Sequence, residues 1–327
     1  MNSKANIIKV NKAVSSPWCF IINPHAGGGR AARQWPDLYQ RLKSHSVTFE
    51  HAITTSSSQA RALACSRANA GIRNFIAVGG DGTVNDILQG VFQSKLPLNN
   101  VTLSVVPWGT GNDWARFHHI PHSPNKWLSF FLNASQAPHD VGIAQYGKAY
   151  ASHHAFLNIA GTGLDSHIIQ QMGAAGGKSL RYYLTLFKSL YRYTANTMTL
   201  TLAPLTGGDG HAASKITKRH KALITMVCIG QYGGSGMRFA PMANSHDGLL
   251  DVLSITDIPF WHRIISTPYL LNGKINQHPA AFYQQTPSVA VSDSTNEYFQ
   301  CDGEIIDKLP VRFCIHPQQI NTLISSR

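Results

Sequence analysis

Two short segments of this sequence combine glycines with acidic side chains. Residues 79–83 read Gly-Gly-Asp-Gly-Thr, and residues 107–113 read Pro-Trp-Gly-Thr-Gly-Asn-Asp. Each follows a β-type run, residues 75–78 and 102–106, and each leads into a segment that can be helical. A strand that ends at glycines and enters a helix surrounds a small concavity with backbone N–H groups, which is a good site for a phosphate.

The aspartates in these turns indicate a further component of the site. A carboxylate repels a phosphate, so a bare phosphate cradle has no use for one. A divalent cation between the two groups removes that repulsion. The two turns therefore predict chemistry on a nucleotide triphosphate that is bound together with a divalent metal.

The elements around these turns predict a parallel sheet. A third glycine-rich turn, residues 23–29, follows a buried strand at residues 18–22, and a helix with an apolar face comes next. A second strand at residues 47–53 and a second helix ending near Gly71 precede the acidic turns. This alternation favours an α/β, doubly wound sheet whose ligands bind at the carboxyl ends of the strands. All three turns would then converge on one crevice.

From about residue 139 the pattern changes to short β-type runs separated by Gly, Asn and Asp turns. Such a pattern is typical of an antiparallel sheet or sandwich. We therefore expect an α/β domain at residues 1–138 and a β-rich domain at residues 139–327, with the last residues able to pack back on the first domain. The active site is expected in the cleft between the two domains.

Composition restricts the partners. The net charge of +12 would attract nucleotides, nucleic acid or anionic lipid headgroups, but nothing except the charge favours nucleic acid. We find no signal-peptide pattern and no apolar run of 18 residues, which predicts a cytoplasmic protein that is at most peripheral to a membrane. The aromatic cluster Trp127, Phe130 and Phe131 is expected to form a buried helix face.

The order of motifs resembles that of the diacylglycerol kinase catalytic-domain family, which includes soluble bacterial lipid kinases and the sphingosine and ceramide kinases. The resemblance runs from about residue 19 to residue 315. It rests on the three turns, on Asp140-Val-Gly142, on the spaced motif from Asn158 to Asp165, on Asp-Gly-Leu-Leu-Asp at residues 247–251, and on Asp-Gly-Glu at residues 302–304. It implies a nucleotide domain like that of NAD kinase and phosphofructokinase, followed by a β-sandwich domain.

The resemblance also implies roles for individual residues. Asp81 would act through the catalytic Mg²⁺, with Asp140 in the same metal network. Asp302 and Glu304 would lie beside the acceptor hydroxyl, with Glu304 the expected base. A second, structural Mg²⁺ would bind Asp247 and the backbone carbonyls of Asn244 and Leu249. The residues implied to bind ATP are Asn23, Pro24, His25, Ala26, Gly27, Thr54, Gly80, Asp81, Gly82, Thr83, Asn85, Asp86, Gly109, Thr110, Gly111 and Asn112.

One position departs from the family pattern. The first motif usually has Ser where Ala26 stands. The substitution removes a hydroxyl contact to phosphate and leaves the neighbouring N–H groups in place, so ATP affinity is the property in question.

These patterns together predict an ATP- and Mg²⁺-dependent lipid kinase that phosphorylates a lipid hydroxyl, with a diacylglycerol-type acceptor favoured. The substrate would be presented at the inner membrane surface. An NAD kinase-like activity is an alternative, because it shares Gly-Gly-Asp-Gly, and so is a catalytically silent binding protein of the same fold. The turn at residues 107–113 and the Asp-Gly-Glu segment favour the lipid kinase.

Overall fold

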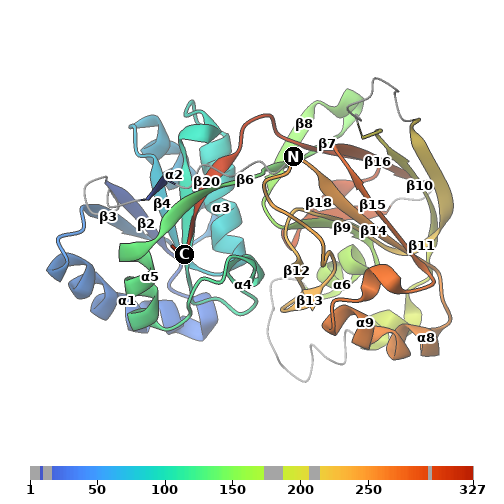
Figure 1. Ribbon diagram of the computed structural model, residues 1–327, viewed down its shortest axis with the longest axis horizontal. Helices are drawn as coiled ribbons and strands as arrows, with labels where there is room; N and C mark the ends of the chain where they lie inside the picture. The colour runs from blue at the N-terminus through green and yellow to red at the C-terminus, as the bar shows by residue number, and fades with distance from the viewer. Residues whose placement is uncertain (1–7, 10–16, 173–186, 206–213, 294–296, 327) are drawn as a thin grey trace. The chain divides into compact units, whose positions relative to one another are not determined.

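The computed structural model describes residues 8–9, 17–172, 187–205, 214–293 and 297–326. The chain divides into two compact units (Figure 1). The first consists of Met1–Val141 together with Pro317–Arg327, and the second of Gly142–His316.

The first unit is built on a seven-stranded sheet in the order β1-β6-β20-β5-β4-β2-β3. Its strands are β1 (Ile8–Lys9), β2 (Trp18–Ile22), β3 (Phe49–Ile53), β4 (Asn74–Gly79), β5 (Thr102–Pro107), β6 (Ser135–His139) and β20 (Ile320–Ile324). Strands β3, β2, β4, β5 and β20 run parallel, and β6 pairs antiparallel with both β20 and β1. The predicted parallel sheet is therefore confirmed, and the C-terminal strand returns to this unit.

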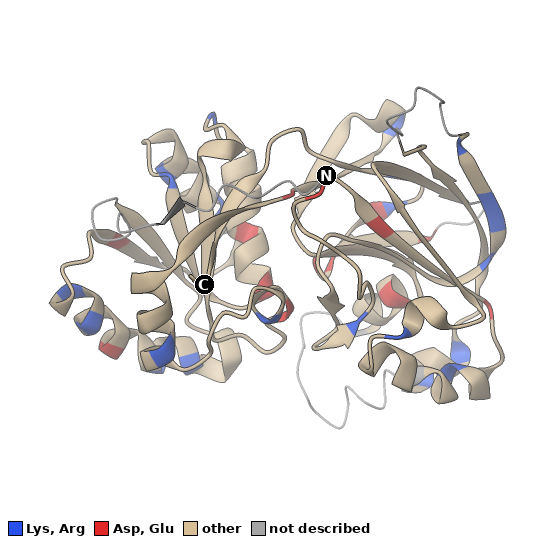
Figure 2. Ribbon diagram, viewed as in Figure 1, with Lys and Arg blue, Asp and Glu red and all other residues tan. Residues whose placement is uncertain are grey.

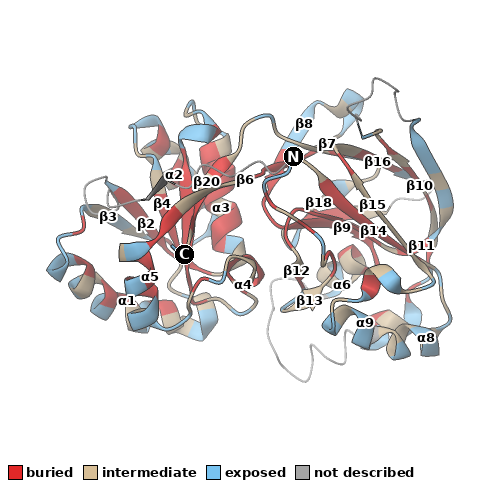
Figure 3. Ribbon diagram, viewed as in Figure 1, coloured by how far each residue is buried: buried red, intermediate tan, exposed pale blue. Residues whose placement is uncertain are grey.

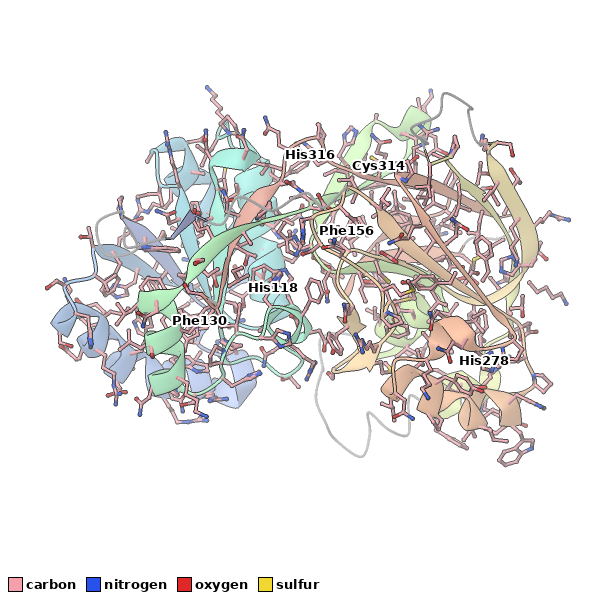
Figure 4. All side chains as sticks on the ribbon, in the orientation of Figure 1. His118, Phe130, Phe156, His278, Cys314 and His316 are labelled. Atoms are coloured by element: carbon pink, nitrogen blue, oxygen red, sulfur yellow. The ribbon has the colours of Figure 1, made fainter. Side chains whose placement is uncertain are left out.

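Helices alternate with the parallel strands. They are α1 (Ala26–Ser44), α2 (Ser57–Asn69), α3 (Asp81–Phe92), the 3₁₀ turn η1 (Leu98–Asn100), α4 (Asp113–Phe117) and α5 (Pro124–Asn133). Helix α2 packs on α3, and α1 on α5. The aromatic face of α5 is buried as predicted: Trp127 stacks on Phe131, and Phe130 (Figure 4) is also buried. Burial of such large side chains contributes a major share of the folding free energy.

The second unit is a large antiparallel sheet. Its main path runs β18-β17-β9-β11-β10-β16-β19-β7-β8, and β14 and β15 branch from β11. These strands are β7 (Gly142–Tyr146), β8 (Ser152–Phe156), β9 (Ile159–Gly163), β10 (Asn196–Leu202), β11 (Ile216–Cys228), β14 (Leu250–Thr256), β15 (Ala281–Thr286), β16 (Ser288–Asp293), β17 (Tyr298–Cys301), β18 (Glu304–Lys308) and β19 (Val311–Ile315). The branching follows from the length of β11, which pairs with β10 in its first half and with both β9 and β14 in its second.

Successive side chains of these strands point to opposite faces of the sheet, so that one face is directed into the core. The inward side chains include Phe156 (Figure 4), Phe299 and Phe313, whose rings meet edge to face. Figure 3 shows the same separation of buried and exposed faces in both units. The predicted β-sandwich-like second domain is confirmed.

Short helices and a small hairpin complete the second unit. They are the 3₁₀ turns η2 (Lys148–Tyr150) and η3 (Ile275–Gln277), the helices α6 (Leu164–Met172), α8 (Phe260–Ile265) and α9 (Thr267–Leu271), and the two-stranded β12 (Tyr232–Gly233) and β13 (Met237–Arg238). Within the described ranges, none of the helices combines the length and apolarity needed to cross a bilayer.

Candidate functional site

The three glycine-rich turns lie together at one edge of the first sheet. Strands β2, β4 and β5 are parallel neighbours, so the turns that follow them meet at their carboxyl ends. The backbone N–H groups of Trp108 and Gly109 donate to the carbonyl oxygen of Gly79 at 2.8 and 2.9 Å. Residues 23–29, 79–83 and 107–113 are called the three-turn cluster below.

Glycine is required where the turns touch. Gly27 has φ +59°, and a Cβ built there would lie 2.1 Å from the carbonyl oxygen of Trp108. Gly109 approaches Gly80 so closely that its Cβ would lie 2.3 Å from the Gly80 Cα. Any side chain at these positions would separate the turns. The glycines of the motifs therefore set the contact between strand ends, besides leaving backbone groups accessible.

Polar side chains fix the shape of two turns. The Asn23 side chain accepts the His25 N–H at 3.1 Å, and the Ala26 N–H donates to the Asn23 carbonyl, so Pro24 and His25 form a tight turn. Asn112 is left-handed at φ 54°. Its amide accepts the Gly109 N–H at 3.1 Å and donates to the Gly109 carbonyl at 2.8 Å. Thr110 and Gly111 are held between these two contacts, and Thr110 is exposed.

Asp81 connects two of the turns. It is the first residue of α3, yet its carboxylate accepts the backbone N–H groups of Asp113 and Trp114, each at 3.0 Å, at the start of α4. The negative charge therefore lies near the first turn of two helices, where the backbone dipoles stabilise it. Asp81 thus has a structural role that its position in a turn did not indicate.

The other residues predicted for this site differ in their burial and in their contacts. Thr54 is buried, and its hydroxyl donates to the Ile22 carbonyl at 3.1 Å, so it supports the end of β2. Gly82 and Thr83 occupy the first turn of α3, Gly82 exposed and Thr83 buried, whereas Asn85 is buried one turn further on. Asp86 pairs with Arg61 of α2 at 2.9 Å. The structure therefore places Asp86 in the contact between α2 and α3 and does not bring it into the three-turn cluster.

Asp140 lies just beyond β6, away from the turns in the chain but linked to α4. The indole N–H of Trp114 donates to His139 Nε2 at 3.1 Å, which places the proton of the neutral ring on Nδ1, 2.7 Å from the Asp140 carbonyl. His118 (Figure 4), at the end of α4, packs its ring 5.0 Å from that of His139. The Asp140 carboxylate is buried and accepts the Gln319 amide at 2.7 Å.

The Asp-Gly-Glu segment is a hairpin turn between β17 and β18. Asp302 and Gly303 have φ of 48° and 86°, the left-handed pair that a two-residue hairpin requires. The Asp302 carboxylate accepts three backbone N–H groups, those of Leu157, Asn158 and Ile159, at 2.8 to 3.0 Å. Most of its lone pairs are therefore committed to backbone N–H groups.

Glu304 differs from Asp302. It is exposed and stands at the first position of β18, directly opposite Cys301 in the hairpin register. Of the two acids, Glu304 is the more exposed residue, and it stays the predicted base. From the sequence alone both acids were candidates, with Glu304 the expected base.

Two further residues, Gln300 and Asp165, support the hairpin, and no sequence pattern indicated that they pair. The side chain of Gln300 accepts the Gly303 N–H at 2.8 Å and donates to Asp165 Oδ2 at 2.7 Å. Burial raises the pKa of Asp165 to about 6, and the hydrogen bond from Gln300 partly opposes that rise. Asp165 ends the spaced motif that begins at Asn158, which was the only signal for it.

The loop before β14 contains the predicted structural metal residues. Asp247 is exposed, and its carboxylate accepts the Leu249 N–H at 3.0 Å across Gly248, while Asn244 lies earlier in the same loop. Asp251, the second acid of the motif, is buried and accepts the Tyr283 hydroxyl at 2.6 Å. Desolvation raises the pKa of both carboxyls.

The donor sets fit a magnesium ion that takes few protein ligands. Over the described ranges, no group of three or more His, Cys, Asp or Glu side chains converges as a metal site would require. Mg²⁺ commonly binds one or two carboxylates together with substrate phosphates and water, so a single carboxylate such as that of Asp81 is compatible with a metal that is carried by a nucleotide. In the loop before β14, the available donors are the carboxylate of Asp247 and backbone carbonyls.

The turn contacts yield a stability prediction. Gly27→Ala should lower the free energy of unfolding by about 1–2 kcal/mol for the left-handed conformation and by roughly 1–3 kcal/mol more for displacing the Trp108 carbonyl. Gly28→Ala is the matched control: it is also left-handed, at φ +65°, but its Cβ meets nothing within 4 Å. Urea unfolding of both variants tests this. Equal losses of unfolding free energy in the two variants would mean that the close contact with Trp108 does not contribute to the cost of Gly27→Ala.

Comparisons with known proteins agree with this architecture. The family described as diacylglycerol kinase catalytic domain matches residues 17–144, and the YegS C-terminal NAD kinase beta sandwich-like domain matches residues 158–324. A probable lipid kinase YegS-like of Pseudomonas savastanoi pv. phaseolicola is 28% identical over 81% of this chain and 80% of its own. A diacylglycerol kinase of Staphylococcus aureus is 23% identical over 90% of this chain and 87% of its own.

Solved structures show the same fold. A crystal structure of a diacylglycerol kinase from Bacillus anthracis strain Sterne superposes with a TM-score of 0.68 at 18% sequence identity, covering 95% of this chain and 97% of the other. At that identity the likeness concerns the fold alone.

Proposed function

This chain belongs to the diacylglycerol kinase catalytic-domain family. We therefore propose that it is a lipid kinase that transfers the γ-phosphoryl group of ATP to a lipid hydroxyl. The observation that carries the proposal is the three-turn cluster, in which backbone N–H groups and the carboxylate of Asp81 meet at the ends of three parallel strands. A diacylglycerol-type acceptor is favoured, in keeping with the names of the relatives.

In the proposed mechanism the first unit holds the donor. The backbone around Asn23 to Gly27, the start of α3 at Gly80 to Thr83 and the turn at Gly109 to Asn112 bind the phosphates. Mg²⁺, when bound, neutralises the charge on the phosphate oxygens. Asp81 is its proposed protein ligand, and the two helix N–H bonds fix the orientation of that carboxylate. Asp140 is proposed to belong to the same Mg²⁺ network, and Thr54, bonded to the Ile22 carbonyl at the end of β2, is proposed to lie beside the ATP. Ala26 leaves only backbone groups at its position.

In the second unit Glu304 is the proposed general base. Its carboxylate accepts the proton of the lipid hydroxyl as the oxygen attacks the γ-phosphorus, and the bond from that phosphorus to the β,γ-bridging oxygen breaks to release ADP. Asp302 positions Glu304 by holding the hairpin against residues 157–159, and Gln300 holds the other side of the same turn. Most of the catalysis would come from positioning and charge stabilisation, as is usual for phosphoryl transfer.

The experiment that tests this function uses pure protein, γ-labelled ATP and Mg²⁺ with two acceptors. Diacylglycerol in mixed micelles should become labelled, and NAD should not. Label in NAD alone would favour the NAD kinase-like alternative, which the description of the second domain keeps open. Label in neither acceptor, nor in a lipid extract, would favour a silent protein of this fold.

The second metal site yields its own prediction. We propose that Asp247, with the carbonyls of Asn244 and Leu249, binds a structural Mg²⁺. Added Mg²⁺ should raise the melting temperature of wild type in the absence of ATP, because an ion that binds only the folded state stabilises that state. Asp247→Ala removes a ligand of the ion and should therefore reduce this rise. The control is Asp307→Ala, which removes another exposed acid of the same unit. Superimposable Mg²⁺ titrations of wild type and Asp247→Ala would exclude a metal there.

A further inference from the structure

The exposed hydrophobic side chains of this protein are concentrated in one region. Among the described residues, ten large hydrophobic side chains are exposed, and six of them lie in two short stretches of the second unit. These six are Phe187, Tyr191, Trp261, Ile265, Tyr269 and Leu271. They are called the aromatic patch below, and α8 and α9, which carry four of them, are largely exposed in Figure 3.

Phe260 connects three members of the aromatic patch across the two stretches. The Phe260 ring lies between the two stretches, with its centroid 5.5 Å from that of Phe187, 5.1 Å from Tyr191 and 5.1 Å from Trp261. Contiguous apolar surface of this kind is uncommon on a protein without a partner for it.

An arginine holds the two stretches together. Arg263 of α8 donates to the carbonyls of Leu190 and Tyr193 at 2.6 and 3.0 Å, and it pairs with Asp257 at 3.0 Å. The guanidinium thereby joins the end of the helical stretch at residues 187–192 to the start of α8. The patch is therefore held in place by hydrogen bonds from a largely buried cation and is not a chance meeting of loose side chains.

The charge around the patch has one sign. Residues 187–193 and 257–278 contain four Lys and Arg side chains and a single acid, Asp257, which is paired with Arg263. The remaining cations, Lys188, Arg192 and Lys274, are exposed. Figure 2 shows several blue Lys and Arg segments beside α8 and α9. A second copy of the chain would bring these cations against one another, which disfavours self-association. An anionic surface would complement them.

We propose that the aromatic patch is the surface by which this protein docks on an anionic lipid bilayer, with Trp261 and Ile265 entering the interface. The inference rests on the proposed function, because an enzyme that acts on a lipid must reach it at a membrane. Trp and Tyr rings prefer the boundary between headgroups and acyl chains, and Lys and Arg can place their charged ends among the headgroups. Insertion supplies the apolar part of binding and the three exposed cations supply the electrostatic part.

The tryptophans of this chain allow a direct test. Five of the six, Trp18, Trp35, Trp108, Trp114 and Trp127, are at most 5% exposed, all in the first unit, whereas Trp261 is 69% exposed. Mixed vesicles of phosphatidylcholine and phosphatidylglycerol should shift the tryptophan emission to the blue, and lipids brominated on the acyl chains should quench it. Both changes should vanish in Trp261→Phe. The partition coefficient from sedimentation should fall about tenfold or more in the double variant Trp261→Glu/Ile265→Glu, since apolar contacts are exchanged for charge repulsion.

Ile216→Glu, which places one negative charge, against two in the double variant, on an exposed hydrophobic position of β11, should bind vesicles within about twofold of wild type. Vesicle binding without any quenching of Trp261, or equal binding of the double variant and wild type, would overturn the proposal. Turnover of a water-soluble short-chain diacylglycerol is measured in parallel. The double variant should keep that activity, so a failure of docking is distinguished from a failure of the proposed kinase function.

Discussion

We expect Glu304→Gln to lower kcat by about 10²–10⁴-fold, the usual cost of removing a general base. Glutamine has nearly the same shape and lies on an exposed strand position, so the melting temperature and ATP affinity should stay close to those of wild type. Steady-state kinetics with ATP and a diacylglycerol acceptor measure the effect. The matched control is Asp307→Asn, which neutralises another exposed acid on β18 and should leave kcat within a few-fold of wild type.

Asp302→Asn tests the second acid of the same hairpin and is measured beside Glu304→Gln. Because the Asp302 carboxylate accepts three backbone N–H groups, its replacement should lower stability as well as turnover. A Glu304→Gln enzyme that turns over within a few-fold of wild type would show that Glu304 is not the base.

Asp81→Asn should abolish phosphoryl transfer, with a loss of roughly 10³-fold or more, because it removes both the proposed metal ligand and part of the electrostatic stabilisation. The asparagine oxygen can still accept one of the two N–H groups of α4, but the amide nitrogen would face the other donor. We therefore expect a lower melting temperature in addition to the catalytic loss.

Calorimetric titration with ATP separates the two roles of Asp81. If Asp81 binds the metal, Mg²⁺ should strengthen ATP binding in wild type and do so much less in the variant. Asp37→Asn, an exposed acid of α1 that pairs with Arg41, controls for the change in net charge. An unchanged effect of Mg²⁺ in Asp81→Asn would leave the residue with its structural role alone.

The features that could be predicted from the sequence are local. A β-type run followed by glycines and a helix marks each turn of the three-turn cluster, and parallel strands then bring the turns to one edge. The hairpin at Asp302 and Gly303 is likewise a property of the dipeptide. The buried face of α5 follows from the spacing of Trp127 and Phe131.

The features that could not be predicted depend on contacts between residues far apart in the chain. The carboxylate of Asp302 meets the backbone of residues 157–159 only because β17 pairs with β9 in a particular register. Gln300 meets Asp165 for the same reason, and Asp86 meets Arg61 because α3 packs on α2. Single-sequence patterns report periodicity and turn chemistry, whereas register and helix packing are set by the whole core. The aromatic patch was missed because short helices give too few turns for a periodic signal.

In the proposed reaction this chain moves the terminal phosphoryl group of ATP to a lipid hydroxyl. Mass spectrometry of the products tests it most directly, with ATP that carries ¹⁸O on the γ-phosphate, Mg²⁺ and a bacterial lipid extract. We expect one lipid class to gain a phosphate bearing the isotope with wild-type protein, and almost no lipid to do so with Glu304→Gln. Isotope found only in inorganic phosphate or in a nucleotide product would contradict it.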